Sequence, residues 1–548
     1  MTAATAAAPP LAGTAVRAAG DAPPLRVAVS RLRALGCAVE EEPGGTAPPG
    51  LAGRLRLEGT GAGCDIAWSE PGAGLEDERA VQAACGLAHL HGRARGGPRF
   101  LPVDYASVCA GVLASQAVAA AALALDRGGH ALRASVSVAG AALLAVAPYA
   151  AAEAAARRES APGPGTGTVP GQPPPFRSAD GVRFEVETLD ADAWLRFWEA
   201  LGAPREAIAA GWAPFQRRFA TAECPLPAAL FAVPAALPFA DTARTARACG
   251  VGAVPLRPPE EVRERAPESP WRLGPTGPAG ALPPVPPPGR GPLAGLRVVE
   301  ATNRVQGPLA GLLLTLLGAD TVRVEPPGGD PMRGVPPLAG GLSARFAALN
   351  HGKGAVEHDL GTAAGRRAAA ALAAGAHVFL YNWPPGRAER FGLGADGLAA
   401  RAPGLVHVHA DGWAGEEPAP GTPATDFPVQ AHGGVAHLLA DGAGPAPSLV
   451  TLTDVLGGLL AAEAALAGLL LRSRAGTGAR ARTALVDAAR LLRAAGRGTA
   501  HLPRTGTPAA ADPVAAAAAF PAAFTTVHGV ALPRAPWTFA PAGGGSGR

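Results

Sequence analysis

The sequence predicts an α/β protein built on a doubly wound, mostly parallel sheet, with a shortened repeat lobe and a small α+β domain beside it. Two observations lead to this prediction. In the C-terminal half, short apolar runs alternate with longer helical patterns, which is the order expected for a parallel sheet covered by helices. Stretches of this half also recur, in the same order, near the N-terminus, which indicates an internal repeat.

The alternation in the C-terminal half can be followed element by element. Four apolar runs are predicted to be strands, namely LRVVEAT, DTVRVEPP, HVFLYNW and LVHVHADGW. Between them, GPLAGLLLTLLGA and GTAAGRRAAAALAAGA have the spacing of helices. In such folds ligands bind where the carboxyl ends of the strands meet the helix N-termini, so we expect the functional residues there.

The repeat is visible in three pairs of segments. VQAACGLAHLHG matches VQAHGGVAHLLADG, VCAGVLASQAVAAAALAL matches VLGGLLAAEAALAGLLL, and RLRALGCAVEEEPGG resembles LLTLLGADTVRVEPPGG. The distance from Gly36 to Gln82 is 46 positions, whereas that from Gly318 to Gln430 is 112. The first copy therefore lacks the middle of the lobe.

Pro/Gly-rich passages set the expected domain boundaries. We predict a shortened, degenerate lobe at 1–160, a small α+β domain at 176–265, a Pro-rich linker at 266–293, a complete Rossmann-like lobe at 294–500 and a Pro/Ala/Gly-rich tail at 501–548. The small domain is expected because residues 176–204 have the pattern of a turn, an alternating strand and then a helix.

Composition excludes several classes of function. The 548 residues carry a net charge of only +4, without basic runs, so nucleic acid is not an expected partner. The six cysteines are far apart and lack zinc-ligand spacing, which indicates reduced thiols in a cytoplasmic protein without a bound metal. The N-terminus does not resemble a secretory signal. The apolar stretch 106–125 is interpreted as a buried helix and not as a membrane span.

A few rare residue types are concentrated in one region. The chain has a single lysine, Lys353, and three asparagines, Asn303, Asn350 and Asn382, all within an eighty-residue stretch. In a sequence dominated by Ala, Gly, Pro and Arg, this clustering indicates that a chemical requirement keeps these residues there.

Six motifs in order give the C-terminal half a resemblance to a known family. They are LAGLRVVEATNRVQGPLAG, LLGADTVRVEPPGGDPMRG, FAALNHGKGAVEHDL, YNWPPGRAERFGLG, TDFPVQAHGGVAHL and LTDVLGGLLAAEAALAGLLLRSRAGTG. This series resembles the class III CoA-transferases (CaiB/BaiF), which include formyl-CoA and carnitine CoA-transferases and acyl-CoA racemases. The resemblance implies the CoA-transferase III fold. It also implies acyl-CoA and a carboxylic acid as substrates and no tightly bound cofactor. No membrane partner is expected, because the apolar stretch 106–125 is interpreted as a buried helix.

The resemblance places Asp454 at the position of the family's nucleophilic aspartate. The stretch TLTDVLGGLL also predicts Asp454 as the N-cap of a helix, where backbone N–H groups and the helix dipole favour an ionised carboxylate. Such a carboxylate can attack an acyl carbonyl and lead to an aspartyl-CoA thioester. A helix cap without catalytic function is the alternative.

Two further residues are expected in the catalytic site. Asp426 matches a second acidic position of the family, where it could orient substrate or carry a proton. Gln306, in NRVQGP, corresponds to the active-site loop of the transferase branch, at a helix N-terminus suited to an oxyanion. An exposed loop acid and a solvated turn glutamine are the respective alternatives.

The resemblance also implies residues that contact coenzyme A. Asn350 and Lys353 match positions beside the CoA site, where a lysine suits a phosphate. Asn382, Gly386 and Arg390 match the loop near the adenosine end. Pro326 stands where several members have a CoA-contacting arginine, which departs from the family pattern.

In the shortened lobe, the alignment of the repeat puts Ser107 at the position of Asp454 and Glu78 at that of Asp426. The CoA-binding motifs fall in the missing stretch. We therefore expect this lobe to be a scaffold. Because family members form interlocked dimers, we expect a homodimer or an intrachain pseudo-dimer.

Three functions are compatible with these residues. The first is transfer of CoA from an acyl-CoA to a carboxylic acid through Asp454. The second is an acyl-CoA racemase or isomerase, although that branch has a histidine where this chain has Thr425. The third is a noncatalytic CoA-binding scaffold, which the degenerate first lobe would suit.

Overall fold

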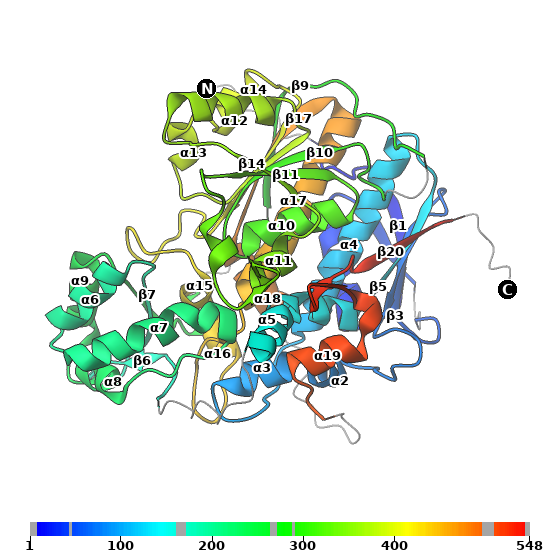
Figure 1. The fold of residues 1–548 in the computed structure, drawn as a ribbon. Coiled ribbons are helices and arrows are strands. Elements are labelled where there is room, and N and C mark those ends of the chain that lie inside the picture. Colours follow the sequence, from blue (N-terminus) through cyan, green and yellow to red (C-terminus); the bar gives the residue numbers. More distant parts are fainter. Residues whose placement is uncertain are drawn as a thin grey trace.

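The computed structural model describes residues 8–42, 47–159, 171–262, 271–287, 291–495 and 509–542. Parts of the predicted linker and tail, including 266–270, 288–290, 501–508 and 543–548, lie outside the described residues, as does the Pro/Gly-rich passage 160–170. The chain forms two large sheets, each with its own helices, and a smaller group of elements at one side (Figure 1).

The C-terminal half contains the parallel sheet that the sequence predicts. Its order is β14 (Gly354–Glu357), β11 (Asp320–Glu325), β10 (Arg297–Ala301), β15 (Val378–Tyr381), β16 (Val406–Asp411), β17 (Thr477–Ala484) and β9 (Trp271–Pro278). All neighbours pair in parallel except β9, which runs antiparallel to β17. Strand β9 lies in the passage predicted to be a linker, so that prediction is wrong for 271–278. Trp271 is buried, and this burial draws the segment into the sheet.

The N-terminal half has a sheet of mixed direction. Its order is β2 (Ala38–Glu41), β1 (Ala15–Ala19), β3 (Leu51–Leu57), β4 (Gly63–Ala67), β5 (Leu132–Ser137) and β20 (Trp537–Pro541). Only β1–β2 and β4–β5 are parallel. Strand β20 comes from the tail, which the sequence left without a predicted structure, and it closes one edge of this sheet by pairing with β5.

A third group of elements projects from one side of the molecule (Figure 1). It contains the antiparallel strands β6 (Phe176–Arg177), β7 (Arg183–Glu187) and β8 (Gly252–Pro255) with helices α6 (Ala191–Ala200), α7 (Arg205–Thr221), α8 (Ala228–Ala235) and α9 (Phe239–Ala248). The other strands form two separate short hairpins, β12 (Leu338–Ala339) with β13 (Leu342–Ser343) and β18 (Phe524–Val527) with β19 (Val530–Pro533).

The remaining helices belong to the same two halves as the large sheets. In the N-terminal half these are α1 (Pro23–Ala34), α2 (Glu78–Ala84), α3 (Leu87–Arg93), α4 (Tyr105–Asp126), α5 (Val138–Glu159) and, from the tail, α19 (Pro513–Ala519). In the C-terminal half they are α10 (Gln306–Leu316), α11 (Ala344–Asn350), α12 (Ala363–Ala374), α13 (Arg387–Arg390), α14 (Ala395–Ala399), α15 (Asp426–His432), α16 (Val435–Leu438), α17 (Leu452–Ala475) and α18 (Leu485–Ala495).

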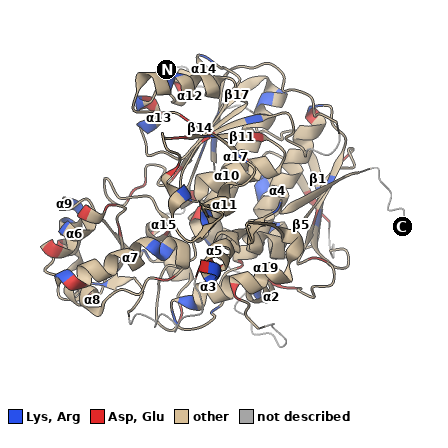
Figure 2. Ribbon diagram, viewed as in Figure 1, with Lys and Arg blue, Asp and Glu red and all other residues tan. Residues whose placement is uncertain are grey.

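Three helices, α4, α5 and α17, are long and apolar enough to cross a membrane by length and composition alone. Within the structure, however, between 83% and 94% of their most apolar windows is buried against other elements. Helices α4 and α17 pack against each other and join the two halves. Among the described residues, the basic and acidic positions are interspersed over the elements in this view (Figure 2).

A buried carboxylate fixes the packing of α4 against α17. Glu463, in the middle of α17, is fully buried and pairs with the guanidinium of Arg31 on α1. Its oxygens also accept hydrogen bonds from Ser115 Oγ of α4 at 2.6 Å and from Trp271 Nε1 of β9 at 3.0 Å. One side chain thus connects elements from both halves of the chain.

Loss of this carboxylate is expected to destabilise the whole molecule. Glu463→Gln leaves the buried guanidinium of Arg31 without a counter-charge, which costs about 3–5 kcal/mol. The midpoint of thermal or urea unfolding should fall sharply. The matched control is Glu58→Gln, which breaks an exposed ion pair with Arg17 and should change stability by about 1 kcal/mol or less. Equal midpoints for the two variants would contradict this role of Glu463.

Candidate active site

Asp454 lies in the first turn of α17, which begins at Leu452. The N-cap is Thr451, so the prediction that Asp454 itself caps the helix is wrong by three positions. Asp454 nevertheless lies in the first turn, where the helix dipole favours negative charge, and its side chain is partly exposed. The structure therefore leaves this carboxylate accessible to a reactant.

Asp426 supports Asp454 from the start of α15 and is completely buried. Its Oδ2 accepts a hydrogen bond from the backbone N–H of Asp454 at 2.7 Å and another from Thr453 Oγ1 at 2.8 Å. Its Oδ1 accepts from the amide of Gln430 on the same helix. The two aspartates, 28 residues apart in sequence, are thus brought together as the sequence predicts.

The environment holds both carboxyls closer to the protonated form than a free aspartate. Burial raises the pKa of Asp454, and the neighbouring charge of Asp426 raises it further. Burial also raises the pKa of Asp426, against the effect of the hydrogen bonds from Gln430, Asp454 and Thr453. Because three donors favour the ionised form of Asp426, the shared proton is better placed on Asp454.

Two arginines supply positive charge to this pair. Arg345 on α11 and Arg304 in the loop before α10 both lower the pKa of Asp454 by their charge, against its burial. Arg345 is 8% exposed, whereas Arg304 is exposed and adopts the left-handed conformation with φ of 67°. Sequence reasoning missed both residues. A charged side chain inside the apolar run SARFAAL was the available signal for Arg345.

Two tyrosines of the N-terminal half hold the start of α17. Tyr149 Oη accepts the backbone N–H of Thr451 at 3.0 Å and lies 3.2 Å from its hydroxyl. Tyr105 Oη donates to the carbonyl of Leu452 at 3.0 Å. Both tyrosines are fully buried or nearly so. The first turn that carries Asp454 is therefore positioned by the other half of the chain, which no motif of the C-terminal half could reveal.

Gln306 begins α10 and lies beside the same turn of α17. Its Nε2 donates to the carbonyl of Asp411 at 3.1 Å. A Cβ at Gly457 would lie 3.1 Å from that nitrogen, and one at Gly458 only 2.8 Å from the backbone oxygen of Gln306. The two glycines therefore permit the close approach of α10 and α17.

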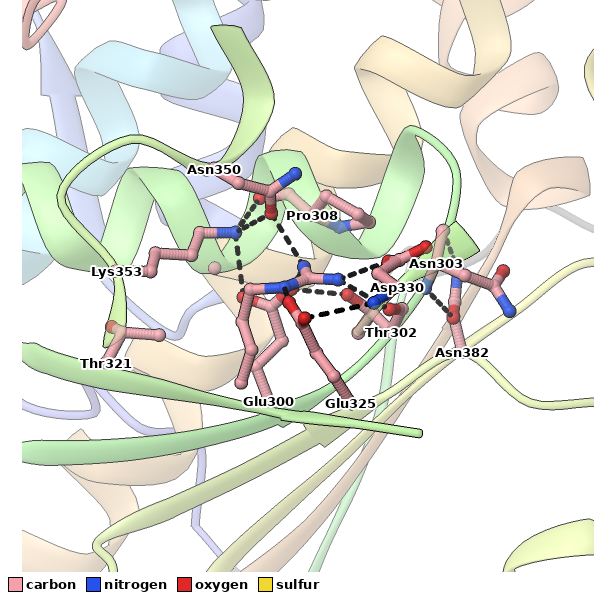
Figure 3. Close-up of polar contacts among 12 residues, drawn as sticks. Glu300, Thr302, Asn303, Pro308, Thr321, Glu325, Asp330, Asn350, Lys353 and Asn382 are labelled. Atoms are coloured by element: carbon pink, nitrogen blue, oxygen red, sulfur yellow. Dashed lines mark hydrogen bonds and ion pairs between the residues drawn. The ribbon is translucent and has the colours of Figure 1, made fainter. Parts of the chain in front are cut away.

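Lys353 lies in a buried polar network at the carboxyl ends of β10 and β11 (Figure 3). Its ammonium contacts Glu300 Oε2 at 2.8 Å, Pro308 O at 2.7 Å and Asn350 Oδ1 at 3.0 Å, and its side chain is fully buried. Burial lowers its pKa to about 8, against the charge of Glu300. The ammonium thus contacts three oxygen atoms of the protein itself, and a contact with a phosphate of coenzyme A stays a prediction.

Arg323 is at the centre of the same network. Its guanidinium donates to Glu300 Oε1 and to Asn350 Oδ1, each at 2.6 Å, and to Asp330 Oδ2 at 2.7 Å. Asn350, also predicted to contact coenzyme A, is buried, and its Oδ1 accepts hydrogen bonds from both Arg323 and Lys353. The rare residues in this stretch therefore support the strand ends.

Asn382 closes the adjacent loop. Its Oδ1 accepts the backbone N–H of Asn303 at 3.0 Å, and its Nδ2 donates to the carbonyl of Asn303 at 2.9 Å (Figure 3). This pair of bonds fixes the residue just before Arg304. Gly386, with φ of 76°, and Arg390 are exposed at α13, on the loop that follows Asn382. Of the predicted CoA contacts, these last two are the ones that the structure leaves open to solvent.

The N-terminal half contains a counterpart of the aspartate pair. Glu78 begins α2 and accepts from Ser107 N at 2.8 Å and from Ser107 Oγ at 2.7 Å, near the start of α4. Gln82 contacts Leu101 and Val103 as Gln430 contacts Ser448 and Val450. Ser107 therefore occupies the place of Asp454, and both Glu78 and Ser107 are completely buried.

The described residues also form a cavity of about 470 Å³ away from the aspartate pair. Its lining residues are Arg257, Glu261, Val262, Glu416, Glu417, His432, Gly433, Val486 and Arg490. The part of the chain that the structure describes contains no group of three or more His, Cys, Asp or Glu side chains that could hold a metal ion.

The chain belongs to CoA-transferase family III, whose family model matches residues 72–269 and 293–531. The match covers elements from both halves, including the two aspartates and their counterparts Glu78 and Ser107. Both segments of the match thus include a long helix that begins beside a buried carboxylate.

Individual relatives match only part of this chain. A protein named "Probable fatty acyl-CoA transferase" from Mycobacterium tuberculosis is 36% identical over 203 residues, which cover 36% of this chain and 51% of the relative. A "Succinyl-CoA:mesaconate CoA-transferase" from Haloarcula hispanica is 35% identical over 208 residues, or 36% of this chain and 52% of the relative. The chain thus spans about half the length of the curated relatives it matches.

Solved structures also match only part of this chain. A crystal structure of a CAIB/BAIF family protein from Brucella suis is 31% identical, covers 37% of this chain and 55% of its own, and has a TM-score of 0.35. A crystal structure of a protein from Mycobacterium tuberculosis is 35% identical. The match covers 37% of this chain and 57% of the solved chain, with a TM-score of 0.35.

The aspartate pair predicts a characteristic pH dependence of stability. An unfolded aspartate titrates near pH 4, whereas the folded pair has raised pKa values. Above about pH 4 the folded state therefore binds more protons than the unfolded state, so the free energy of unfolding falls as pH rises. Asp454→Asn removes much of this penalty, and its thermal midpoint should exceed that of the wild type by a margin that grows with pH.

The matched control is Asp396→Asn, because the side chain of Asp396 is 93% exposed. Its unfolding midpoint should follow the wild-type pH profile. A margin for Asp454→Asn that stays constant or shrinks between about pH 5 and about pH 9 would rule out the raised pKa of the pair.

Proposed function

We propose that this chain is an acyl-CoA:carboxylate CoA-transferase that acts through an aspartyl-CoA thioester on Asp454. The observation that carries the proposal is the partly exposed carboxylate at the start of α17, whose backbone N–H is held by Asp426 and whose ionised form is favoured by the charges of Arg345 and Arg304. Membership of CoA-transferase family III and relatives named as CoA-transferases support it.

The reaction proceeds in two matching halves. The ionised carboxylate of Asp454 attacks the acyl carbonyl of the acyl-CoA, forming a mixed anhydride and releasing the CoA thiolate. The thiolate attacks the aspartyl carbonyl of that anhydride, so that an aspartyl-CoA thioester forms and the free acid leaves. A second carboxylate then attacks the thioester, and the released thiolate takes up the new acyl group and frees Asp454.

The residues around Asp454 have separate tasks in this scheme. Asp426 holds the first turn of α17 by its bond to the backbone N–H of Asp454. A carboxylate of raised pKa is a stronger nucleophile once it is ionised, and the two arginines favour that ionisation. Gln306, next to Gly457, is the proposed donor for the developing oxyanion after it releases the carbonyl of Asp411.

The proposed CoA site follows the carboxyl ends of β10, β11 and β15. Exposed Gly386 and Arg390 are proposed to contact the nucleotide, as the family resemblance implies. Asn350, Lys353 and Asn382 are proposed to act indirectly, because their polar atoms hold the strand ends and the Asn303 loop. Coenzyme A is then a substrate, and no resident cofactor is required.

We infer one active site per chain. The pair Glu78–Ser107 repeats the geometry of Asp426–Asp454 with a serine hydroxyl in place of the second acid, which supports a degenerate repeat lobe in the N-terminal half. Tyr105 and Tyr149 then act as a partner lobe would, so an intrachain pseudo-dimer is proposed. The group around β7 is the proposed small α+β domain, and it contacts the site through the bond of Thr425 to Glu187.

Isotope exchange tests the nucleophile. Wild-type protein is incubated with a panel of acyl-CoAs and ¹⁴C-labelled carboxylic acids, and label in the acyl-CoA pool is measured. Asp454→Asn should lower the exchange rate by at least about 1000-fold, because no carboxylate remains to form the anhydride. Asp487→Asn, which changes an aspartate near the start of α18 instead, serves as the control and should retain exchange.

Survival of exchange in Asp454→Asn would disprove the proposal. The racemase alternative predicts a different outcome, namely incorporation of deuterium at the acyl α-carbon from D₂O without exchange of the acid. The proposal predicts the reverse, because the residue before Asp426 is Thr425, whose hydroxyl is bonded to Glu187.

A further inference from the structure

Arg345 is a buried cation without a carboxylate partner. Its side chain belongs to the first turn of α11, and the residue is 8% exposed. Among the described residues, the guanidinium forms one hydrogen bond, to the backbone carbonyl of Phe219 on α7. It takes part in no ion pair with a described residue. Most of its N–H donors are therefore free, although a buried arginine ordinarily pairs with an acid.

The structure fixes Arg345 on several sides. Ser343 caps α11 by accepting the N–H of Phe346, which sets the first turn in place. The guanidinium carbon lies 5.4 Å from the ring centroid of Tyr149, whose hydroxyl binds Thr451 at the start of α17. Arg345 is thereby held beside the turn that carries Asp454, and elements of three different regions, α5, α7 and α11, meet at this guanidinium.

The charge of Asp454 changes during the proposed reaction. When Asp454 is ionised for attack on the acyl-CoA, its carboxylate compensates Arg345, because the two charges act on each other. Formation of the aspartyl-CoA thioester removes that negative charge. A buried guanidinium without a counter-charge is unfavourable by several kcal/mol, so the intermediate attracts an anion to this position.

We propose that Arg345 binds the carboxylate of the acceptor acid while Asp454 carries coenzyme A. The inference rests on the proposed function and deepens it by assigning the residue that receives the second substrate. The planar guanidinium can hold a carboxylate through two parallel N–H donors, and the bound oxygen lies next to the thioester carbonyl that it attacks. Arg304 adds positive charge from the exposed side.

This arrangement also explains how transfer competes with hydrolysis. Water is neutral and gains little from an uncompensated guanidinium, whereas an acid anion gains a charge-assisted hydrogen bond. The site therefore favours an anionic acceptor at the one stage where a thioester is exposed to attack. When the new acyl-CoA forms, Asp454 regains its charge and again compensates Arg345.

Arg345→Met tests the assignment, because methionine keeps an unbranched apolar stem and removes the charge. The KM for the acceptor acid should rise by about 100-fold. Formation of the CoA adduct on Asp454, measured in the absence of acceptor, should return to within about threefold of the wild-type rate when the pH is raised to ionise Asp454. The fraction of thioester lost to hydrolysis should increase.

Two further variants separate binding from a purely electrostatic effect on Asp454. Arg345→Lys keeps the charge but not the planar fork, so adduct formation should follow the wild-type pH profile while the KM for the acceptor stays raised. Arg345→Ala should regain transfer when guanidinium ion is added at millimolar concentration, a rescue that also shows the variant to be folded. Arg474→Met, at the far end of α17, is the matched control.

An unchanged acceptor KM in Arg345→Met, or an equal loss in adduct formation and in transfer at every pH, would overturn the assignment. Failure of the proposed function is distinguishable, because the wild type would then show neither an adduct nor exchange with any acid. If the wild type exchanges acids and Arg345→Met binds its acceptor normally, only the role of Arg345 is wrong.

Discussion

The packing of α4 against α17 is the constraint on which the rest of the structure depends. Both helices are long, apolar and buried, and each begins beside a buried carboxylate at the N-terminus of a short helix, Glu78 for α4 and Asp426 for α17. Glu463 fixes their contact from the middle of α17, where a single ion pair and two hydrogen bonds join both halves. The position of the first turn of α17 follows from this packing, since Tyr105 and Tyr149 reach it from the other half.

The same geometry has different chemical consequences at its two occurrences. In the N-terminal half, the hydroxyl of Ser107 satisfies Glu78, although burial raises the pKa of that carboxyl to about 7. In the C-terminal half, a second acid stands in place of the serine, and two carboxyls share one environment beside two arginines. In both halves a buried carboxylate thus holds the first turn of a long helix. The halves differ at that carboxylate, Glu78 or Asp426, and at the two residues bonded to it, which are Ala106 and Ser107 in one half and Thr453 and Asp454 in the other.

The parallel sheet and its helices could be predicted, because apolar periodicity is local in sequence. The assignment of Asp426 and Asp454 to one site came from the resemblance of the motifs to the family. Strands β9 and β20 could not, because their partners are distant and their Pro-rich surroundings resemble linkers. Lys353 and Asn382 were recognised as important from their rarity, yet their ammonium and amide groups bind the protein's own backbone and acids. Arg345 and Tyr149 were missed because their significance depends on contacts between halves.

The stoichiometry and location of the covalent intermediate test the central claim most directly. Wild-type protein is quenched after a single turnover with acyl-CoA in the absence of an acceptor acid, and the bound CoA is counted by intact-mass spectrometry and located by peptide mapping. The account predicts one CoA per chain, carried by the peptide that contains Asp454. A second CoA on the peptide that contains Glu78, or one CoA on any other residue, would contradict it.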